Sequence, residues 1–301
     1  MKKALGKYGQ LYLMFIPVLI WYLLFCYEPM SNFTIAFKKF SVIRGIKGSP
    51  WVGMANFQQM FEAPMFWRAF RNTLIISAQN LLFGFPAPIL FALLLNELTA
   101  PRFKKAVQTI SYLPHFISWS VAGGLVYMLL SPDTGALNHL LVMLGGTGKN
   151  YLAISSYFHR IVLFSHMWKS LGWGSIVFLA AITGVDDQLH EAARIDGANR
   201  FQRIWYITLP GMINMIAIQF VLRVGAVMEG GFDQVFNLYT APVYETGDII
   251  DTYIYRLSFV KSTGINLGFT TAVGLFKNVI NFILLMLANG VTKALGQETV
   301  L

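Results

Sequence analysis

The stretch Glu191-Ala192-Ala193-Arg194-Ile195-Asp196-Gly197-Ala198 is a polar island in an apolar part of the chain. Ile207-Thr208-Leu209-Pro210 follows it after a basic and aromatic run. Long apolar runs flank the island, at about 161–182 and 209–227. A polar segment between two such runs is typical of a loop that joins two membrane spans.

Composition places the whole chain in the same class. Of its 301 residues, 55% are hydrophobic and only 12% are charged, and the mean hydropathy is +0.55. These values are too apolar for an ordinary soluble domain. We therefore predict an all-α membrane protein with six transmembrane helices, since six runs approach the length that a bilayer requires. They lie at about 11–27, 73–95, 110–130, 161–182, 209–227 and 269–291.

The first run is expected to continue past Glu28-Pro29, because a proline bends a helix without always ending it. We interpret it as a retained span rather than a cleaved signal, because no small-x-small cleavage site follows it. Basic residues are denser in the loops that share a side with the N-terminus. That density predicts a multi-pass protein of a bacterial inner membrane with both termini in the cytoplasm.

The net charge of +9 does not indicate nucleic-acid binding, because the basic residues lie beside the spans, where lipid head groups account for them. The single cysteine and five scattered histidines predict no metal site. Gly145-Gly146-Thr147-Gly148-Lys149-Asn150 has neither the first glycine nor the final Ser or Thr of a phosphate-binding loop. We therefore expect no catalytic residue and no cofactor in this chain.

The polar loop, at about 183–206, is predicted to form two short helices at the membrane surface. Asp186 or Asp187 suits a helix cap, residues 188–196 are helical in pattern, and Gly197 suits a left-handed helix end. Residues 198–205 form the second helix and Pro210 opens the next span.

Small side chains on the first of these helices would let another protein approach closely. These are Ala192 and Ala193, and Glu191, Arg194 and Asp196 offer charged contacts around them. A helix that only lies at the membrane interface fits the same residues. General physics leaves both possibilities open.

The order Glu-Ala-Ala, then Gly, then Ile-x-Leu-Pro between two spans resembles the cytoplasmic coupling loop of ABC importer permeases of the binding-protein-dependent sugar importer family. The resemblance implies a type I importer permease architecture, in which a coupling helix docks in a cleft of the ATPase subunit. It assigns the coupling role to Glu191, Ala192, Ala193, Asp196 and Gly197. Asp187 departs from the family, whose sugar permeases commonly have proline there.

Other segments resemble the polysaccharide or oligosaccharide branch of these permeases: 17–40, 49–53, 56–57, 232–238 and 248–253. This resemblance implies one permease domain over residues 1–301, with long outer loops at about 28–70 and 230–267. It also implies a second, homologous permease as partner in a heterodimer. Two ATPase subunits would bind ATP and Mg²⁺, and a periplasmic or lipid-anchored protein would deliver the solute.

Charged groups inside spans usually face the bundle interior or a water-filled cavity. The pathway candidates of this kind are Lys169, Arg223, Glu229 and Lys277. Sugar-binding chemistry adds aromatic and amide groups, namely Trp119, Tyr127, Trp168, Trp173, Gln219 and Asn278. Each has a structural alternative: snorkelling, pairing, binding of a backbone carbonyl, or packing at the membrane interface.

Three of the four charged candidates are cationic, which motivates the hypothesis of an acidic solute, a uronate oligosaccharide of the alginate type. An ABC permease for a neutral sugar is one alternative. Another is a secondary transporter driven by an ion gradient, although no acidic residue lies clearly in the middle of a span.

Overall fold

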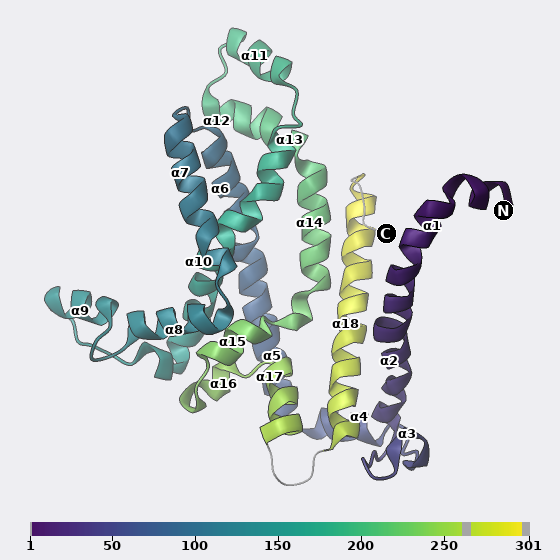
Figure 1. Cartoon of the computed structure of the whole chain (residues 1–301). Helices are drawn as coiled ribbons and strands as arrows, with labels where there is room; N and C mark the ends of the chain where they lie inside the picture. Colours follow the sequence, from purple (N-terminus) through teal and green to yellow (C-terminus); the bar gives the residue numbers. More distant parts are fainter. Residues whose placement is uncertain (1, 261–265, 297–301) are drawn as a thin grey trace. The chain divides into compact units, whose positions relative to one another are not determined.

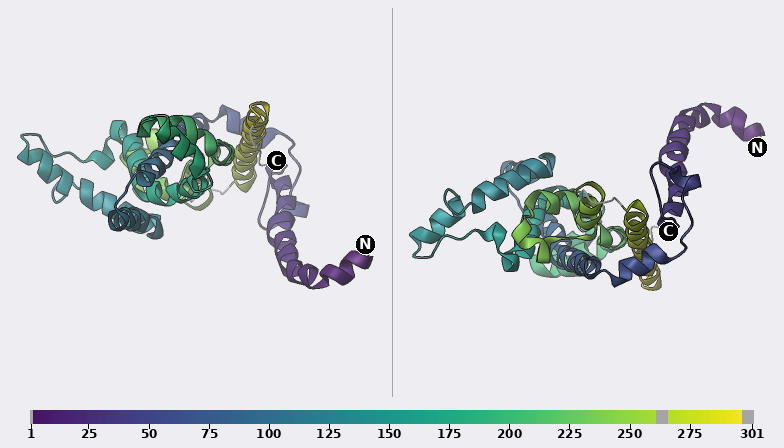
Figure 2. Two further views of the ribbon diagram at one scale, coloured as in Figure 1. Left: turned by 90° about the horizontal axis from the view of Figure 1, so that it is seen from above. Right: turned by 90° about the horizontal axis from the view of Figure 1, so that it is seen from below.

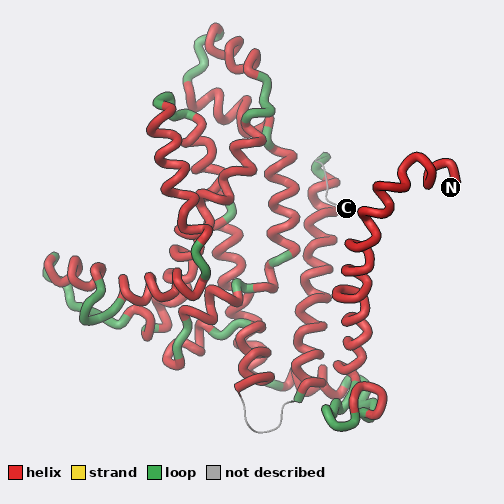
Figure 3. The backbone as a smooth tube through the Cα atoms, in the orientation of Figure 1, coloured by secondary structure: helices red, strands yellow, loops and turns green. Residues whose placement is uncertain are grey.

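The structure, a computed structural model, describes residues 2–260 and 266–296. Residues 261–265 of the expected second outer loop, and both chain ends, lie outside the described residues. Across those described ranges the regular structure is helical (Figure 3), with one isolated antiparallel bridge between Lys38 and Trp51. The chain divides into two compact units, residues 1–64 with 254–276 and residues 65–253 with 277–301.

The first unit begins with a long helix that is kinked at Tyr8 and whose pitch then changes three times. Its parts are α1 (Lys2–Tyr22), a π-helical turn (Leu23–Tyr27), α2 (Glu28–Met30) and a 3₁₀ segment (Ser31–Phe37). Residues 8–37 are therefore one helix, long and apolar enough to cross a membrane. Pro29 lies within it, as predicted, because a proline in the first turn of a helical segment has no N–H to leave unbonded.

Two short helices follow in this unit, α3 (Gly45–Gly48) and α4 (Ala55–Glu62). The start of α4 is tied to the end of the long helix by Asn56, whose Nδ2 donates to the carbonyls of Ala36 at 2.8 Å and Lys38 at 3.1 Å. Phe37 stacks on Trp51 with ring centroids 5.5 Å apart. This part of the predicted outer loop is therefore folded rather than extended.

The second unit carries the remaining spans and the polar loop. Its first elements are α5 (Pro64–Gln79), a π-helical turn (Asn80–Gly84), α6 (Pro86–Asn96), α7 (Pro101–Tyr112), a 3₁₀ turn (Leu113–Phe116), α8 (Trp119–Leu130), α9 (Ala136–Met143), a 3₁₀ turn (Tyr151–Ala153) and α10 (Ser155–Ile182). Next come α11 (Asp187–Ile195), α12 (Arg200–Arg203), a π-helical turn (Ile204–Thr208), α13 (Leu209–Gly211), α14 (Ile213–Gly225) and a 3₁₀ turn (Val227–Glu229). The last are α15 (Phe232–Leu238), a 3₁₀ turn (Ala241–Val243) and α16 (Tyr244–Gly247). The unit boundaries fall inside α17 (Ile250–Tyr255) and α18 (Leu267–Ala294), so the π-helical turn between them (Arg256–Val260) belongs to the first unit.

The predicted number of spans agrees with these helices. In the described residues 2–260 and 266–296, three helices are long and apolar enough to cross a membrane, at 8–37, 64–96 and 267–294, and up to six do so if each of three bent pairs is one span. The all-α membrane fold predicted from the apolar runs is confirmed.

Two of the predicted spans are not straight, which corrects the sequence-based boundaries. The run at 110–130 is broken between Phe116 and Trp119 by a bend of 106°. Pro114 lies in the 3₁₀ turn before the break, and Ser118 caps the new helix by accepting a hydrogen bond from the Val121 N–H at 3.3 Å. The run at 209–227 bends by 63° near Met212, after Pro210. Inside these apolar runs a proline thus interrupts the helix, and in the first of them a capping serine begins the next helix.

Helix α10 is the centre of the second unit, in contact with α6, α7, α14, α15 and α16 (Figures 1 and 2). Glycines allow the close approach: a Cβ on Gly172 would clash with the Ser111 carbonyl of α7, and one on Gly174 would lie 3.1 Å from Pro88 Cγ of α6. Small residues at such contacts let membrane helices pack by van der Waals attraction. Buried side chains of α10 then join two apolar clusters, one around Phe158 and one around Phe178.

Candidate functional site

The polar loop forms a helix with a defined cap at each end. α11 begins after Asp186, whose Oδ1 accepts a hydrogen bond from the Gln188 N–H at 2.9 Å. It ends at Gly197, which has a φ of +81°. The Ala198 N–H donates to the Ala193 carbonyl at 2.8 Å, and the Gly197 N–H to the Arg194 carbonyl at 3.1 Å. These bonds form a Schellman cap, and they confirm the predicted helix start and left-handed end.

The predicted second helix is shorter than expected. α12 covers only residues 200–203, and it is fixed by a reciprocal capping box between Asn199 and Gln202 at 2.8 and 2.9 Å. A π-helical turn at 204–208 then leads into the bend before α14. The loop as a whole is therefore a rigid helical hairpin that continues directly into the next span.

Helix α11 has no buried residue within this chain, and Figure 1 shows it extending beyond α7 and α12 at the end of its unit. The proposed coupling residues Glu191, Ala192, Arg194, Asp196 and Gly197 are exposed, and Ala193 is half-buried. Apolar side chains accompany them: Leu189 is 54% exposed, Ile195 87% and Phe201 79%. An exposed apolar surface rimmed by charges is typical of a protein-binding surface.

Lys169, the first charged pathway candidate, is buried in α10. Its Nζ donates to the carbonyl of His115 at 2.7 Å and lies 5.5 Å from the centre of the Trp119 ring. His115 belongs to the turn that breaks the third span, where carbonyls lose their helical partners. Lys169 therefore has a structural role: it donates a hydrogen bond to a carbonyl that the break leaves without a helical partner.

Lys277 in α18 is also paired. Its Nζ lies 2.6 Å from Asp251 Oδ1 of α17, and the two side chains are 15% and 21% exposed. A cation and a carboxylate at this distance and burial neutralise each other inside the span. Asn278 beside it is exposed, and Gln219 in α14 is half-buried.

Arg223 and Glu229 lie at the end of α14 and in the turn that follows it. Both line a small cavity together with Asn80 and His166. Within residues 2–260 and 266–296, no ion pair joins Arg223 to Glu229. These two candidates therefore differ from the lysines, whose charges are satisfied inside the chain.

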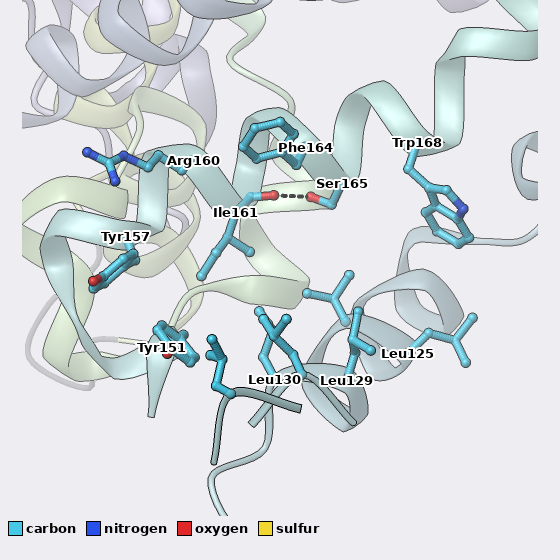
Figure 4. Close-up of a pocket in the computed structure, with 13 residues that line it drawn as sticks. Leu125, Leu129, Leu130, Tyr151, Tyr157, Arg160, Ile161, Phe164, Ser165 and Trp168 are labelled. Carbon is cyan, nitrogen blue, oxygen red and sulfur yellow. Dashed lines mark hydrogen bonds between the residues drawn. The ribbon is translucent and has the colours of Figure 1, made fainter. Parts of the chain in front are cut away.

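The aromatic candidates are spread over two surfaces. Trp173 stacks on His115 with ring centroids 4.4 Å apart, and its indole is 44% exposed. Tyr127 is 57% exposed on α8. Trp168 lines a cavity of about 690 Å³ between α8, α9 and α10, shown in Figure 4, where most of the other lining side chains are aliphatic or aromatic. In the same close-up Ser165 Oγ donates to the Ile161 carbonyl at 2.6 Å, so this serine turns its polar atom back to its own helix.

Comparison with known proteins identifies the family. Residues 84–297 match the family described as binding-protein-dependent transport system inner membrane component. The chain belongs to this family. It is thus a permease, the transport component of a system located in the inner membrane.

Individual relatives cover nearly the whole permease. The polygalacturonan/rhamnogalacturonan transport system permease protein YteP of Bacillus subtilis is 43% identical over 288 residues, which are 96% of this chain and 89% of YteP. A solved bacterial ABC transporter involved in the import of the acidic polysaccharide alginate contains a chain 41% identical to this one, with a TM-score of 0.89 and coverage of 97% and 98%. A second alginate transporter structure, in complex with an alginate pentasaccharide-bound periplasmic protein, gives 40% identity, a TM-score of 0.91 and coverage of 100% and 99%.

Three polar residues of the permease were missed by the sequence reasoning. Asp251 neutralises Lys277, and Asn80 and His166 line the cavity of Arg223. Asn80 follows Gln79 and His166 follows Ser165 within apolar runs, a pattern that also fits satisfied interior groups. Asp251 lies 26 positions before Lys277 and outside the predicted last span, so only the fold brings the two together.

Proposed function

We propose that this permease is the transmembrane subunit of an ATP-driven importer that moves an acidic oligosaccharide across the bacterial inner membrane by alternating access. The observation that carries this proposal is the identity of 40–43% over nearly the full chain to permeases named for polygalacturonan/rhamnogalacturonan and for alginate. All three polymers contain uronic acid residues, which place a carboxylate on a sugar ring. The common chemistry of these relatives is therefore an anionic sugar chain.

ATP hydrolysis in this proposal belongs to two separate ATPase subunits, which bind the ATP and Mg²⁺, so this chain contributes no cofactor and no catalytic group. The exposed helix α11, with capped ends, supports the docking of such a subunit, because a rigid helix transmits a displacement to the span it adjoins. Glu191, Ala192, Ala193, Arg194, Asp196 and Gly197 form the contact surface in this proposal.

The other partners follow from the same architecture. A second, homologous permease completes the pathway as a heterodimer, and a periplasmic or lipid-anchored solute-binding protein docks on the outer loops at 28–70 and 230–267. The polar loop at 183–206 and both termini are then cytoplasmic. An even number of spans, with up to six in the described residues, supports placing the termini on one side.

The permease, co-expressed with the proteins encoded beside it, tests this proposal after purification and reconstitution in proteoliposomes. We expect an ATPase and a second permease to co-purify, and ATP-dependent uptake of oligoalginate, oligogalacturonate or both. A neutral oligosaccharide of equal length serves as the control solute. Purification of the permease without an ATPase, or uptake of the neutral oligosaccharide equal to that of the acidic one, would overturn the proposal.

A further inference from the structure

A small polar cavity lies inside the second unit, where α5 gives way to a π-helical turn. Its volume is about 150 Å³, and it is lined by Asn80 from that turn, His166 from α10, and Arg223 and Glu229 from the end of α14 and the following turn. At about 30 Å³ per water molecule, it has room for about five waters. It can thus hold a polar fragment of the size of part of one sugar ring.

Two polar atoms at this cavity lack a partner. Asn80 Oδ1 and His166 Nε2 are buried and make no hydrogen bond within the described protein. They lie together: a Cβ built on Gly84 would be 3.7 Å from Asn80 Oδ1 and 3.6 Å from His166 Cδ2. Unmade hydrogen bonds are costly in a membrane span, where apolar residues of similar size would cost nothing. Both atoms belong to residues that line one cavity but are shielded from its open space, so a polar ligand reaches them when the Asn80 and His166 side chains turn toward it.

The charges at the cavity define the chemistry of that ligand. Arg223 carries a guanidinium, whose donors form a fork that matches a carboxylate, and no ion pair occupies it among the described residues. Glu229 lines the same cavity and opposes an incoming anion. Asn80 Oδ1 accepts a hydrogen bond, which a sugar hydroxyl donates. A uronic acid residue presents both groups, a carboxylate and hydroxyls, on one ring.

The wall that carries Arg223 is held in place by hydrogen bonds from neighbouring helices. Ser77 Oγ of α5 donates to the Val227 carbonyl. The Met228 N–H donates to Asn281 Oδ1 of α18 at 2.9 Å. Gly230, with a φ of +60°, then turns the chain so tightly that an added Cβ would lie 3.1 Å from Ile249 Cδ1. The cavity is therefore preorganised, which lowers the entropic cost of binding.

We propose that Asn80, His166 and Arg223 form a subsite for one uronic acid residue of the solute, with its carboxylate on Arg223 and a hydroxyl on Asn80. His166 Nε2 completes the subsite as donor or acceptor, according to its tautomer. The carboxylate of Glu229 repels the carboxylate of the solute and so weakens its binding, which favours release of the solute. This inference rests on the proposed import of acidic oligosaccharides.

The test compares one uronate oligosaccharide as the free acid with its methyl ester, which removes the charge and keeps the ring. In proteoliposomes of the complete transporter, the wild type is expected to favour the acid. Arg223→Gln should lower uptake of the acid about tenfold or more, as expected for the loss of a charged hydrogen bond, with little change for the ester. Asn80→Leu should lower uptake of both, and Glu229→Gln should raise the acid-to-ester ratio.

Arg71→Gln is the matched control, because Arg71 is an exposed arginine of α5 that does not line this cavity. Co-purification of the partner subunits and basal ATPase rates verify that each variant is assembled. If the wild type imports neither form, the proposed function fails. Two results with a wild type that imports the acid would refute the subsite and leave the cavity as a place for water only. One is an acid-to-ester uptake ratio in Arg223→Gln equal to that in Arg71→Gln. The other is unchanged uptake in Asn80→Leu.

Discussion

Gly197 offers a perturbation of the coupling loop whose magnitude follows from the structure. Its φ of +81° lies in the left-handed region, and a Cβ built on it meets no atom within 4 Å. Gly197→Ala therefore introduces backbone strain and no steric clash. A left-handed conformation costs a non-glycine residue about 1–2 kcal/mol, which lowers the equilibrium constant for forming the capped helix about 5–30-fold.

The strain should appear as weaker ATPase docking, because a docked α11 requires the same cap. We expect the affinity of the ATPase subunit for the detergent-solubilised permease pair to fall, by at most the same factor of about 5–30. Uptake per ATP hydrolysed should fall in parallel. Gly197→Asn should recover most of the loss, since asparagine tolerates the left-handed conformation better than alanine does.

Gly290→Ala is the control, because Gly290 lies in helix α18, has no positive φ and also has open space around its Cβ position. This change should leave docking and uptake unaltered or slightly improve stability. Wild-type affinity and uptake in Gly197→Ala would refute the reasoning, since the cap geometry would then have no part in coupling. Equal losses in Gly197→Ala and Gly290→Ala would refute it as well.

Three further predictions concern single contacts. Glu191→Lys reverses a charge on the exposed α11 and should leave membrane insertion intact while uncoupling ATP hydrolysis from uptake, and normal vesicle uptake would contradict it. Gln234→Leu removes two hydrogen bonds of 2.6 and 2.8 Å to α10 and should destabilise the permease by about 1–3 kcal/mol. The loss should appear as a lower unfolding midpoint in detergent, and an unchanged midpoint would be inconsistent with this packing. Lys277→Met should destabilise the permease by about 1–3 kcal/mol, because it leaves the partly buried Asp251 unpaired. The double variant Lys277→Met with Asp251→Leu should recover most of this loss. A double variant no more stable than the single one would disprove the pairing.

The features predicted best from the sequence are those that depend on residues close together in the chain. The caps of α11 could be predicted because an aspartate before a helix and a glycine after it satisfy backbone groups locally. The six apolar runs were found because bilayer thickness fixes their length. The 106° break near Ser118 was missed, because Pro114 and Ser118 stand in an apolar run whose average hydropathy hides them.

Partners that lie far apart in the sequence could not be predicted from it. Lys169 and the His115 carbonyl are 54 positions apart, and nothing in either segment specifies the other. Lys277 and Asp251 are 26 positions apart and meet only because α17 and α18 pack together. Their pairing depends on the tertiary fold, which determines whether a charge in a span is satisfied or open.

This distinction changes how polar residues in the spans are interpreted. A lone charge in an apolar run indicates function only if the chain itself does not satisfy it, because a satisfied charge already offsets its desolvation. Lys169 and Lys277 are satisfied, whereas Asn80 and His166 each have a buried polar atom without a partner in the described protein. For the subsite proposed above, these neutral atoms are therefore a stronger indication of a bound polar group than a charge that the chain already satisfies. Arg223 gains its significance from lying at their cavity rather than from its charge alone.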